Sequence, residues 1–528
     1  MKQKISLFTT ASEYEKLPYY SFNAISLKTI HSYSETPNMN SLTAAAVNET
    51  PEAASGPKEN PYRSILNAQR KAFMANGVLS FEQRIAHLDT LKRAIGEFKD
   101  PLIEAVMSDF GHRNEVETIA TEVIAPAGEI GFTKSKLKGW MKHRRVRPTL
   151  QTLGGTGKIL YQPKGVIGVM GAWNYPASLS LSPLIGAMAA GNHCMVRPSD
   201  LSPATTEVMK QMLAKHFEDN YITVIDGDVN ASIAFSELPF DHLVYTGGTQ
   251  VGSMVMQAAA KNLTPVTLEM GGKSPVIIAD DADMNRAIES ILMGKLINSG
   301  QTCIAPDYIL IPEQMKERFI ELCSENIAQR YPSLAQNDDI TWIINERHFQ
   351  RIQGLIDDAK EKGARVIQVN PASETIPEGK RIIPPTLITD VNDDMEVMRE
   401  EIFGPLLPVL GYQKMDDAIQ YINDRPRPLA LYYFGKNNQR AIDTVYSTTS
   451  GGACVNETML HVSHNNMPFG GIGPSGLGGY HGFDGFVEFS HKKSVYYQGP
   501  ISPAKWIKPP YAPKAKSVMT WVANKVTG

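Results

Sequence analysis

The sequence has few cysteines, and they form no pattern typical of a metal site or a disulfide framework. Its 528 residues include four cysteines, Cys194, Cys303, Cys323 and Cys454, and none belongs to a CxxC or CxxH pair. A structural zinc site and a disulfide-rich fold are therefore not expected. Isolated cysteines in a long chain are typical of a reducing compartment, so we expect a cytoplasmic protein.

The chain also lacks a strong excess of charge and a long apolar run. Its net charge is −3, with 20% charged and 42% hydrophobic residues, so no basic surface for nucleic acid is predicted. The nearly apolar stretch at residues 183–191 is far shorter than the roughly 20 residues of a membrane-spanning helix. The first residues, Met1 to Lys4, are not followed by a sustained apolar region, so we expect no secretory signal.

The remaining pattern predicts an extension followed by α/β structure. Residues 1–58 are polar and rich in Ser, Thr and Asn, which predicts a mostly disordered extension. One hypothesis is that translation starts at Met39 within it, and the alternative is a tolerated disordered tail. Apolar residues three and four apart predict helices over residues 60–143. Strands and helices then alternate from residue 166, which is typical of parallel β-α-β units in a doubly wound sheet. The alternation resumes near residue 275, so we expect a second α/β domain that begins close to Glu269.

The two ends of this region carry further elements. A glycine-rich run at 154–157 indicates a hairpin, and residues 486–497 alternate apolar and polar side chains like a strand. Residues 513–526 place Val518, Met519 and Val522 on one helical face, with lysines nearby. This helix could dock on its own or a partner subunit, which we favour, or lie on a membrane surface.

A thiol and a carboxylate stand in segments of the kind that line a pocket. Cys303 ends the run NSGQTC after an apolar helical segment, and Glu269 follows an apolar run and precedes two glycines. A thiolate can attack a carbonyl carbon while a carboxylate takes or relays protons, so the pair could perform covalent chemistry at a carbonyl. From these residues alone, a buried structural thiol and an exposed carboxylate at a strand end remain open as alternatives.

Three glycine-rich runs bear on nucleotide binding. Residues 471–476 match GxGxxG, but no strand precedes them and no helix follows, so a dinucleotide fingerprint is not predicted there. Residues 271–274 resemble the end of a phosphate-binding loop, but Thr267 occupies the place of its first glycine. The run from Tyr245 to Gly252 is the better candidate, because a strand ends and a helix begins there and backbone N–H groups can face a phosphate.

Four motifs together resemble the aldehyde dehydrogenase family. They are the segments around Glu269 (LEMGGKSP) and Cys303 (NSGQTC), residues 173–176 (WNYP) and residues 400–405 (EEIFGP). The resemblance covers about residues 60–500 in order, and includes residues 468–471 and 475–476. Within the family, the chain resembles the branch of coniferyl aldehyde dehydrogenases and related dimeric fatty and aromatic aldehyde enzymes. Residues 240–243, 246–249, 331–334 and 343–345 carry that narrower likeness.

The resemblance implies two doubly wound α/β domains with a β oligomerisation arm. It assigns a dinucleotide-binding domain to residues 59–146 and 162–268, the arm to 147–161 and 485–500, and a catalytic domain to 269–452. Residues 453–484 would return to the active site, and residues 501–528 would form a tail with the amphipathic helix. The expected assembly is a homodimer.

The implied reaction is the NAD(P)-dependent oxidation of an aldehyde to a carboxylic acid. Cys303 would form a thiohemiacetal and then a thioester, Asn174 would stabilise the oxyanion, and Glu269 would activate the water for hydrolysis. Aromatic, coniferyl-type aldehydes and medium- or long-chain aliphatic aldehydes are the implied substrates. No metal is implied.

The implied cofactor is NAD, with NADP possible. Arg197 and Asp200 stand where the family has Lys and Glu, and Gly248 stands where it usually has Ser. A carboxylate near the ribose favours NAD, whereas a guanidinium could accept a 2′-phosphate. Glu401 would hold the nicotinamide ribose and Phe403 would pack beside the nicotinamide. The full implied cofactor set is Trp173, Arg197, Ser199, Asp200, Thr246, Gly247, Gly248, Gly252, Glu401 and Phe403.

Two other classes of protein remain as alternatives. A cysteine-dependent hydrolase or acyltransferase would use Cys303 without a dinucleotide, but no evident Cys–His partnership supports it. A non-catalytic relative is disfavoured because Cys303, Glu269 and Asn174 are all retained.

Overall fold

The computed structural model describes residues 59–149, 152–500, 502 and 508–528. The predicted disordered extension at residues 1–58, with Met39, lies outside these described residues. Everything below concerns the unit that begins at Glu59. It contains two large, mostly parallel sheets with helices packed on them and a small antiparallel sheet.

The first large sheet is doubly wound, as the alternation of strands and helices predicted. Its order is β15-β7-β6-β3-β4-β5, with β3 to β7 parallel and β15 antiparallel to β7. The strands are β3 (Val166–Met170), β4 (His193–Arg197), β5 (Ile222–Val224), β6 (His242–Thr246), β7 (Val266–Glu269) and β15 (Gly476–Leu477). The chain order reverses between β3 and β6, so their carboxyl ends flank the crevice where ligands bind in such sheets.

Helices cover both faces of this sheet because its strands are apolar on both sides. Side chains on one face of β3, such as Ile167, pack with α2, α5, α6 and α7, whereas Val166 and Met170 pack on the other with α1, α8 and α9. These helices are α1 (Arg63–Asn76), α2 (Phe81–Glu97), α5 (Ala125–Trp140), α6 (Ser178–Ala190), α7 (Pro203–His216), α8 (Val229–Ser236) and α9 (Thr249–Ala260). The predicted helical region 60–143 also contains α3 (Lys99–Phe110), α4 (Glu115–Thr118) and a π-helical turn, η1 (Ile119–Ile124).

The second large sheet forms the expected second α/β domain. Its order is β10-β11-β12-β9-β8-β13-β14, and only β10 is antiparallel to its neighbour. The strands are β8 (Pro275–Ile278), β9 (Tyr308–Pro312), β10 (Arg365–Gln368), β11 (Thr386–Thr389), β12 (Leu406–Tyr412), β13 (Ala430–Phe434) and β14 (Gly452–Val455). Alternate residues face opposite sides: Val276 and Ile278 join one core, and Ile277 joins the other.

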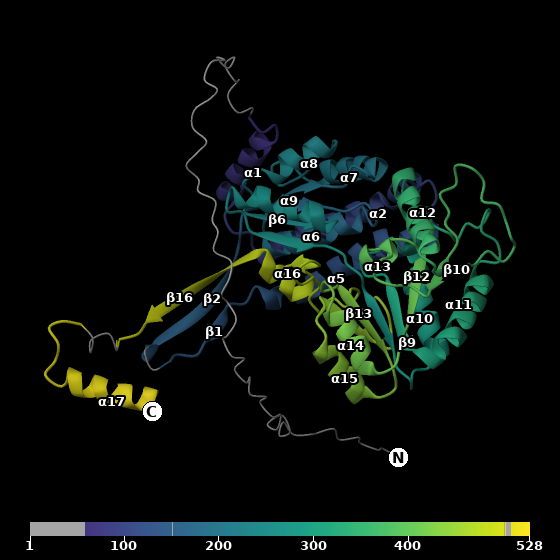
Figure 1. Cartoon of the computed structure of the whole chain (residues 1–528). Coiled ribbons are helices and arrows are strands. Elements are labelled where there is room, and N and C mark those ends of the chain that lie inside the picture. Colours follow the sequence, from purple (N-terminus) through teal and green to yellow (C-terminus); the bar gives the residue numbers. More distant parts are fainter. Residues whose placement is uncertain (1–58, 150–151, 501, 503–507) are drawn as a thin grey trace, which may run out of the picture. The chain divides into compact units, whose positions relative to one another are not determined.

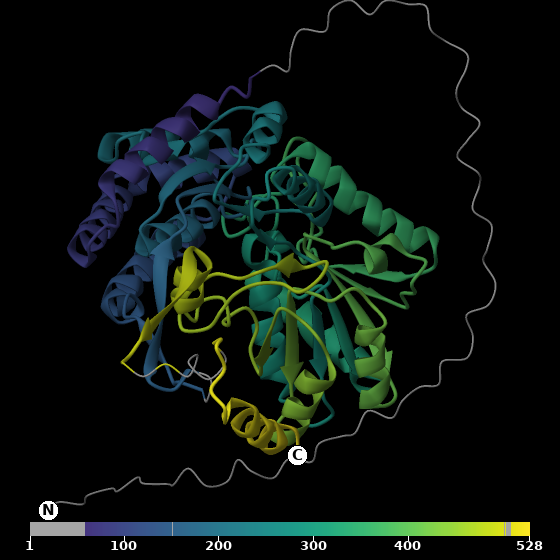
Figure 2. The same cartoon turned by 90° about the vertical axis from the view of Figure 1, so that its left-hand side faces the viewer.

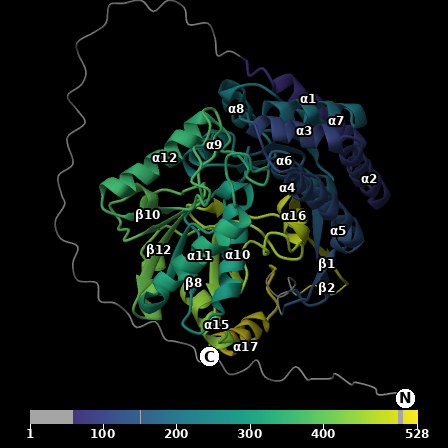
Figure 3. The same ribbon diagram turned by 90° about the vertical axis from the view of Figure 1, so that its right-hand side faces the viewer.

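Two groups of helices enclose these two cores. The helices α10 (Met284–Leu296) and α11 (Lys316–Arg330) lie side by side on one face, as Figure 3 shows. The opposite core receives α12 (Glu346–Glu361), α14 (Met415–Asn423) and α15 (Asn438–Ser447). Shorter elements are η3 (Ile297–Gly300), η4 (Glu313–Met315) and α13 (Glu396–Arg399). The starts of α10, α12 and α15 are capped by Asp283, Asn345 and Asn437, whose side chains accept a bond from the first turn.

The third sheet joins two segments that are far apart in the sequence. It contains β1 (Arg144–Val146), β2 (Gly155–Pro163) and β16 (Ser490–Gln498) in the order β1-β2-β16, all antiparallel. Figure 1 shows β2 and β16 side by side along their full length. The hairpin predicted around residues 154–157 therefore exists, and β16 is an edge strand among the described residues.

The late strand was predicted to begin too early. Residues 486–488 end a short helix, α16 (Gly482–Glu488), and the strand begins at Ser490. Phe486 is buried in the core of the first sheet's domain, which the helix allows and a strand pointing into the arm would not. Figure 2 shows the yellow C-terminal segment with α16 passing beside both large domains before it enters the arm.

The predicted C-terminal helix is confirmed as α17 (Ala515–Thr527). Val518 and Val522 are half-buried, whereas Met519, Trp521 and Val526 are exposed. Among the described residues, no helix has the length and hydropathy needed to cross a membrane.

Candidate active site

Carboxyl ends of neighbouring parallel strands bring the predicted site residues together. Asn174 follows β3, Thr246 and Glu269 end β6 and β7, and those two residues are directly paired across the strands. The Gly171 N–H donates to the carbonyl of Arg197, so the chain after β3 stays in register with the end of β4. This is the crevice at which the order of the sheet reverses, and it is the expected place for a ligand.

The loop before Cys303 has an unusual backbone. Asn298 and Ser299 have positive φ angles of 51° each, and Gly300 has a φ angle of 74°. A Cβ on Gly300 would lie 2.3 Å from the carbonyl oxygen of Gly404, so only glycine fits. The loop therefore turns sharply between α10 and Cys303. The thiol emerges half-buried at the edge of the second domain's core.

Asn174 is held against this loop. Its side chain is 3% exposed, and Nδ2 donates to the backbone carbonyl of Gln301 over 3.1 Å. An amide Nδ2 has two protons, so one donor position remains for an oxygen beside Cys303. The side chain that the sequence suggested as an oxyanion donor is therefore buried next to the segment that carries the thiol.

Glu269 is a buried carboxyl group without a hydrogen-bond partner. It is 3% exposed, and neither carboxylate oxygen is hydrogen-bonded. Burial, with a smaller contribution from the charge of Glu488, raises its pKa well above the usual range. A Cβ on Gly470 would lie 3.2 Å from Oε1, so a small residue is required beside this carboxyl group.

The thiol of Cys303 has a raised pKa as well. Burial and the charges of Glu401 and Glu269 raise its pKa to about 12, and the backbone N–H groups of Cys303 and Ile304 oppose this. The thiol is therefore protonated at rest, and a base must accept its proton during attack on a carbonyl. Glu269 and Glu401 are the carboxyl groups whose charges act on it.

Glu401 lies against the glycines that follow β7. Its carboxylate occupies the space where a side chain on Gly271 would stand, with Oε1 2.1 Å from an ideal Cβ. Burial and the charge of Asp307 raise its pKa to about 8, while the Gly272 N–H, Lys273 and Arg351 oppose this. Lys273 is paired with Asp307 and donates to the carbonyls of Val397 and Glu400, so it is engaged within the protein.

The turn after β6 has the features of a phosphate site. Gly248 precedes α9, no side chain caps the first turn of that helix, and the buried Thr246 Oγ1 has no hydrogen-bond partner. A Cβ on Gly247 would lie 2.3 Å from the Tyr245 hydroxyl, and a Cβ on Gly252 would lie 2.5 Å from the Met270 sulfur. A Cβ on Gly248 would face open space. These groups fit a dinucleotide, because free N–H groups at a helix start can bind a pyrophosphate.

The residues at the end of β4 and just after it differ in burial and in hydrogen bonding. Arg197 is buried, and its guanidinium donates to the backbone carbonyls of Pro198, Gly227 and Asp228. Ser199 is half-buried and accepts a bond from the Leu201 N–H, while Asp200 is exposed. The Arg197 side chain is therefore held in place by the protein itself, and the exposed charge at this strand end is Asp200.

Aromatic rings from three segments meet beside the crevice. The ring of Trp173 lies 5.3 Å from Phe403 and 5.1 Å from His348, both measured between ring centres. Trp173 and Phe403 were predicted cofactor residues, whereas His348 was not predicted. His348 is the third residue of α12, a position that the sequence pattern marked only as helical.

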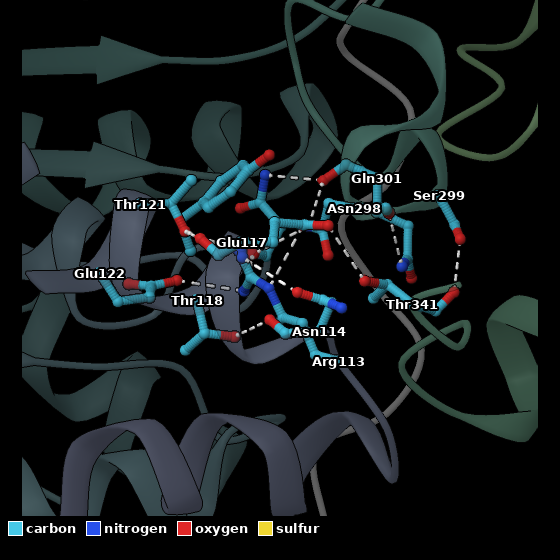
Figure 4. Close-up of polar contacts among 12 residues, drawn as sticks. Arg113, Asn114, Glu117, Thr118, Thr121, Glu122, Asn298, Ser299, Gln301 and Thr341 are labelled. Carbon is cyan, nitrogen blue, oxygen red and sulfur yellow. Dashed lines mark hydrogen bonds and ion pairs between the residues drawn. The ribbon is translucent and has the colours of Figure 1, made fainter. Parts of the chain in front are cut away.

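The sequence did not predict a buried polar network around Arg113, which Figure 4 shows. Arg113 is fully buried, and its Nη1 donates to the backbone carbonyl of Asn174 over 3.2 Å and to Glu122 over 3.1 Å. The Gln301 side chain, in the loop before Cys303, donates to the Asn298 and Trp342 carbonyls and accepts from the Ile344 N–H. No sequence signal marked Arg113, because a single basic residue in a helical region is usually on the surface.

The fold and this site define a dinucleotide-dependent oxidoreductase built from two α/β domains. The family model for the Aldehyde dehydrogenase family matches residues 32–495. The chain belongs to the aldehyde dehydrogenase family, and it is an enzyme that oxidises an aldehyde to a carboxylic acid with NAD(P). The alternative of a thiol hydrolase without a dinucleotide is not favoured.

Three similar proteins place the chain within this family. A probable coniferyl aldehyde dehydrogenase of Pseudomonas aeruginosa is 45% identical over 453 residues, which cover 86% of this chain and 94% of the relative. The 4,4'-diaponeurosporen-aldehyde dehydrogenase of Staphylococcus aureus is 38% identical over 442 residues, covering 84% of this chain and 95% of the relative. The substrate-bound structure of Staphylococcus aureus AldH is 36% identical with a TM-score of 0.81, and the match covers 87% of this chain and 99% of that one.

The backbone of the Cys303 loop leads to a prediction about Gly300. Gly300→Ala should lower the free energy of unfolding and the activity, because a positive φ and a clash with a carbonyl oxygen each cost about 1–3 kcal/mol. The measurement is denaturant unfolding together with steady-state turnover. Gly354→Ala is the control: it lies within α12 with no atom within 4 Å of its Cβ, and should be neutral or stabilising. Equal stability of the two variants would contradict the loop conformation described above.

Proposed function

We propose that this enzyme oxidises aldehydes through a covalent intermediate on Cys303. The observation that carries the proposal is a half-buried thiol under the electrostatic influence of Glu269, a buried carboxyl group without a hydrogen-bond partner. Such a carboxyl group has both oxygens available to accept a proton from a thiol or a water. Asn174, buried beside the same loop, supplies an amide donor.

The proposed steps use these three side chains in order. Glu269 accepts the proton of the Cys303 thiol, directly or through a water, as the sulfur forms a bond to the carbonyl carbon. Asn174 Nδ2 and the Cys303 backbone N–H donate to the oxyanion that develops. When bound, the nicotinamide ring of NAD(P) accepts the hydride from that carbon.

The second half of the reaction releases the acid. Loss of the hydride leaves a thioester on Cys303, and Glu269 takes a proton from the water that attacks its carbonyl carbon. The carbon–sulfur bond then breaks, the sulfur regains a proton and the carboxylic acid leaves. Because Glu269 must be ionised to act as a base and its pKa is raised, hydrolysis should accelerate as pH rises toward that raised pKa.

Two substitutions should separate the half-reactions. Cys303→Ala should abolish aldehyde oxidation and leave nucleotide binding measurable, because only the thiol forms the covalent bond. Glu269→Gln should form reduced nucleotide in an initial burst that is slower than in the wild type, because a water must then take the thiol proton alone, and it should afterwards turn over very slowly, because an amide cannot deprotonate the hydrolytic water. Stopped-flow absorbance at 340 nm follows the formation of reduced nucleotide in both variants. Wild-type turnover in Cys303→Ala, or two wild-type phases in Glu269→Gln, would contradict the assignments.

The proposed substrates are aromatic, coniferyl-type aldehydes, with medium- or long-chain aliphatic aldehydes as the second class. The first class is supported by the name of one relative, a probable coniferyl aldehyde dehydrogenase, while another relative is named a 4,4'-diaponeurosporen-aldehyde dehydrogenase. We expect kcat/KM for coniferyl aldehyde to exceed that for hexanal and decanal. A panel of cinnamyl, benzylic and aliphatic aldehydes at fixed nucleotide concentration tests this, and a preference for decanal would reverse the order.

We propose NAD as the preferred cofactor, with NADP also accepted. Thr246, Gly247, Gly248 and Gly252 would hold the pyrophosphate at the start of α9, and the residues after β4 would lie at the adenosine ribose. Trp173, Glu401 and Phe403 would surround the nicotinamide end. Arg197 is held by three carbonyls, so the exposed carboxylate of Asp200 is the proposed determinant against a 2′-phosphate.

Asp200→Ser should shift the cofactor preference toward NADP. A carboxylate repels the 2′-phosphate, whereas a hydroxyl does not. The quantity to measure is kcat/KM for each nucleotide in both proteins, and Asp219→Ser, on the chain before β5, is a charge-matched control. An unchanged ratio in Asp200→Ser would show that Asp200 does not contact the ribose.

We further propose a cytoplasmic homodimer with the domain boundaries that the sequence suggested. The exposed edge of β16 supports pairing of the arm at 147–161 and 485–500 with a second subunit, because an open strand edge presents unpaired N–H and C=O groups. The first large sheet lies within 162–268 apart from β15 and the last residue of β7, Glu269, and the second lies almost entirely within 269–452. Residues 453–484 begin in β14 of the second sheet and contain β15, which pairs with β7 of the first sheet.

A further inference from the structure

A fully buried arginine lies behind the catalytic loop, in contact with groups from several segments. The Arg113 guanidinium is enclosed by the rings of Phe110 and Tyr175, at 5.0 and 4.9 Å from the ring centres. Its Nη2 donates to Thr121 Oγ1 over 3.0 Å, and its Nε lies 3.4 Å from a carboxylate oxygen of Glu117. Burying a charged group costs free energy unless the group is paired and hydrogen-bonded, and these partners supply the guanidinium with an ion pair and a hydrogen bond.

The guanidinium controls the peptide that carries Asn174. The Asn174 carbonyl accepts from Arg113 Nη1 over 3.2 Å and from Asn298 Nδ2 over 3.0 Å. Asn298 Nδ2 also donates to the Gln301 carbonyl, and the same carbonyl accepts from Asn174 Nδ2. The main chain of Asn174 is therefore fixed both by Arg113 and by the loop that leads to Cys303. Figure 4 shows Arg113, Asn298 and Gln301 of this arrangement.

Two glutamates extend this arrangement into both domains. Glu122 binds Arg113 through one oxygen and accepts from the Ala177 and Ser178 N–H groups, at the start of α6, through the other. Glu117 accepts from the Thr341 hydroxyl over 3.3 Å, and the Thr341 carbonyl accepts from Ser299 in the catalytic loop. Arg113 thus lies between the segment after β3, in the first domain, and the strained loop of the second.

We infer that Arg113 is a positioning residue that sets the distance between the Asn174 amide and the Cys303 sulfur. Its planar fork presents Nη1 to the Asn174 carbonyl and the Glu122 carboxylate while Nη2 donates to Thr121, which a lysine cannot do with the same geometry. It acts through Asn174 and touches no substrate atom. The inference rests on the proposed oxyanion role of Asn174.

A matched pair of threonine substitutions tests the contact without removing a charge. Thr121 and Thr118 each donate to the carbonyl four residues earlier, over 2.8 and 2.9 Å, but only Thr121 accepts from Arg113. Thr121→Val should lower kcat about tenfold and leave KM for aldehyde and the affinity for NAD unchanged, because the reacting groups shift while binding persists. Thr118→Val should keep the wild-type kcat. Equal losses in the two variants would overturn the inference, since general packing would then explain both.

A double-mutant cycle identifies the residue through which Arg113 acts. Asn174→Ala should lower kcat by about 10²–10³-fold, as loss of an oxyanion donor does. Arg113→Lys should lower kcat by about 10²-fold in the wild-type background. In the Asn174→Ala background it should have almost no further effect, because the donor that it positions is gone.

The outcomes separate this inference from the proposed function. A large effect of Asn174→Ala with a fully additive effect of Arg113→Lys would overturn the positioning role alone. A wild-type kcat in Asn174→Ala would overturn the oxyanion assignment and the inference with it. If Arg113→Lys does not fold, Thr121→Val combined with Asn174→Ala completes the same cycle.

Discussion

The site depends on a backbone crossing that buries Glu269. The two-residue strand β15 pairs with the end of β7, so that Gly476 lies opposite Glu269, and the Met270 N–H donates to the Ser475 carbonyl. A Cβ on Gly476 would lie 2.6 Å from the Leu268 carbonyl oxygen, so the two strands can approach this closely only because that residue is glycine. At this pairing the Glu269 carboxyl group is buried, and neither of its oxygens has a hydrogen-bond partner. The crossing also brings the chain back from the second domain to the first.

Burial of this carboxyl group opposes stability and favours chemistry. Its pKa in the folded protein is raised above the unfolded value, so its contribution to stability is fully present below the unfolded pKa and is lost as pH rises toward the folded pKa. The slope from one such group is at most about 1.4 kcal/mol per pH unit. The same raised pKa makes Glu269 a stronger base near neutral pH than an exposed glutamate would be. Destabilised groups of this kind are characteristic of active sites.

Much of the fold could be predicted from local patterns. The alternation of strands and helices predicted from residue 166 is confirmed by β3, α6, β4 and α7, because apolar runs and helical periods depend on neighbouring residues. The start of β16 was wrong because residues 486–488 alternate like a strand but belong to α16, where Phe486 packs into the core. The literal GxGxxG at 471–476 was correctly rejected as a nucleotide fingerprint. Its glycines instead serve the crossing beside Glu269.

The sequence by itself determined the family, the two α/β domains and the chemical groups, because the motifs around Cys303, Glu269 and Asn174 are local and specific. Only the tertiary structure decided how these groups are held. Arg113 lies 61 residues from Asn174 in the chain, and their contact depends on how the segment between α3 and α4 packs behind β3. Likewise, Arg197 could bind a nucleotide phosphate by its charge alone. Its guanidinium is instead held by carbonyls about 30 residues later, because the turn before α8 folds over it. Local patterns report residue types and periods, whereas partners distant in sequence follow from packing.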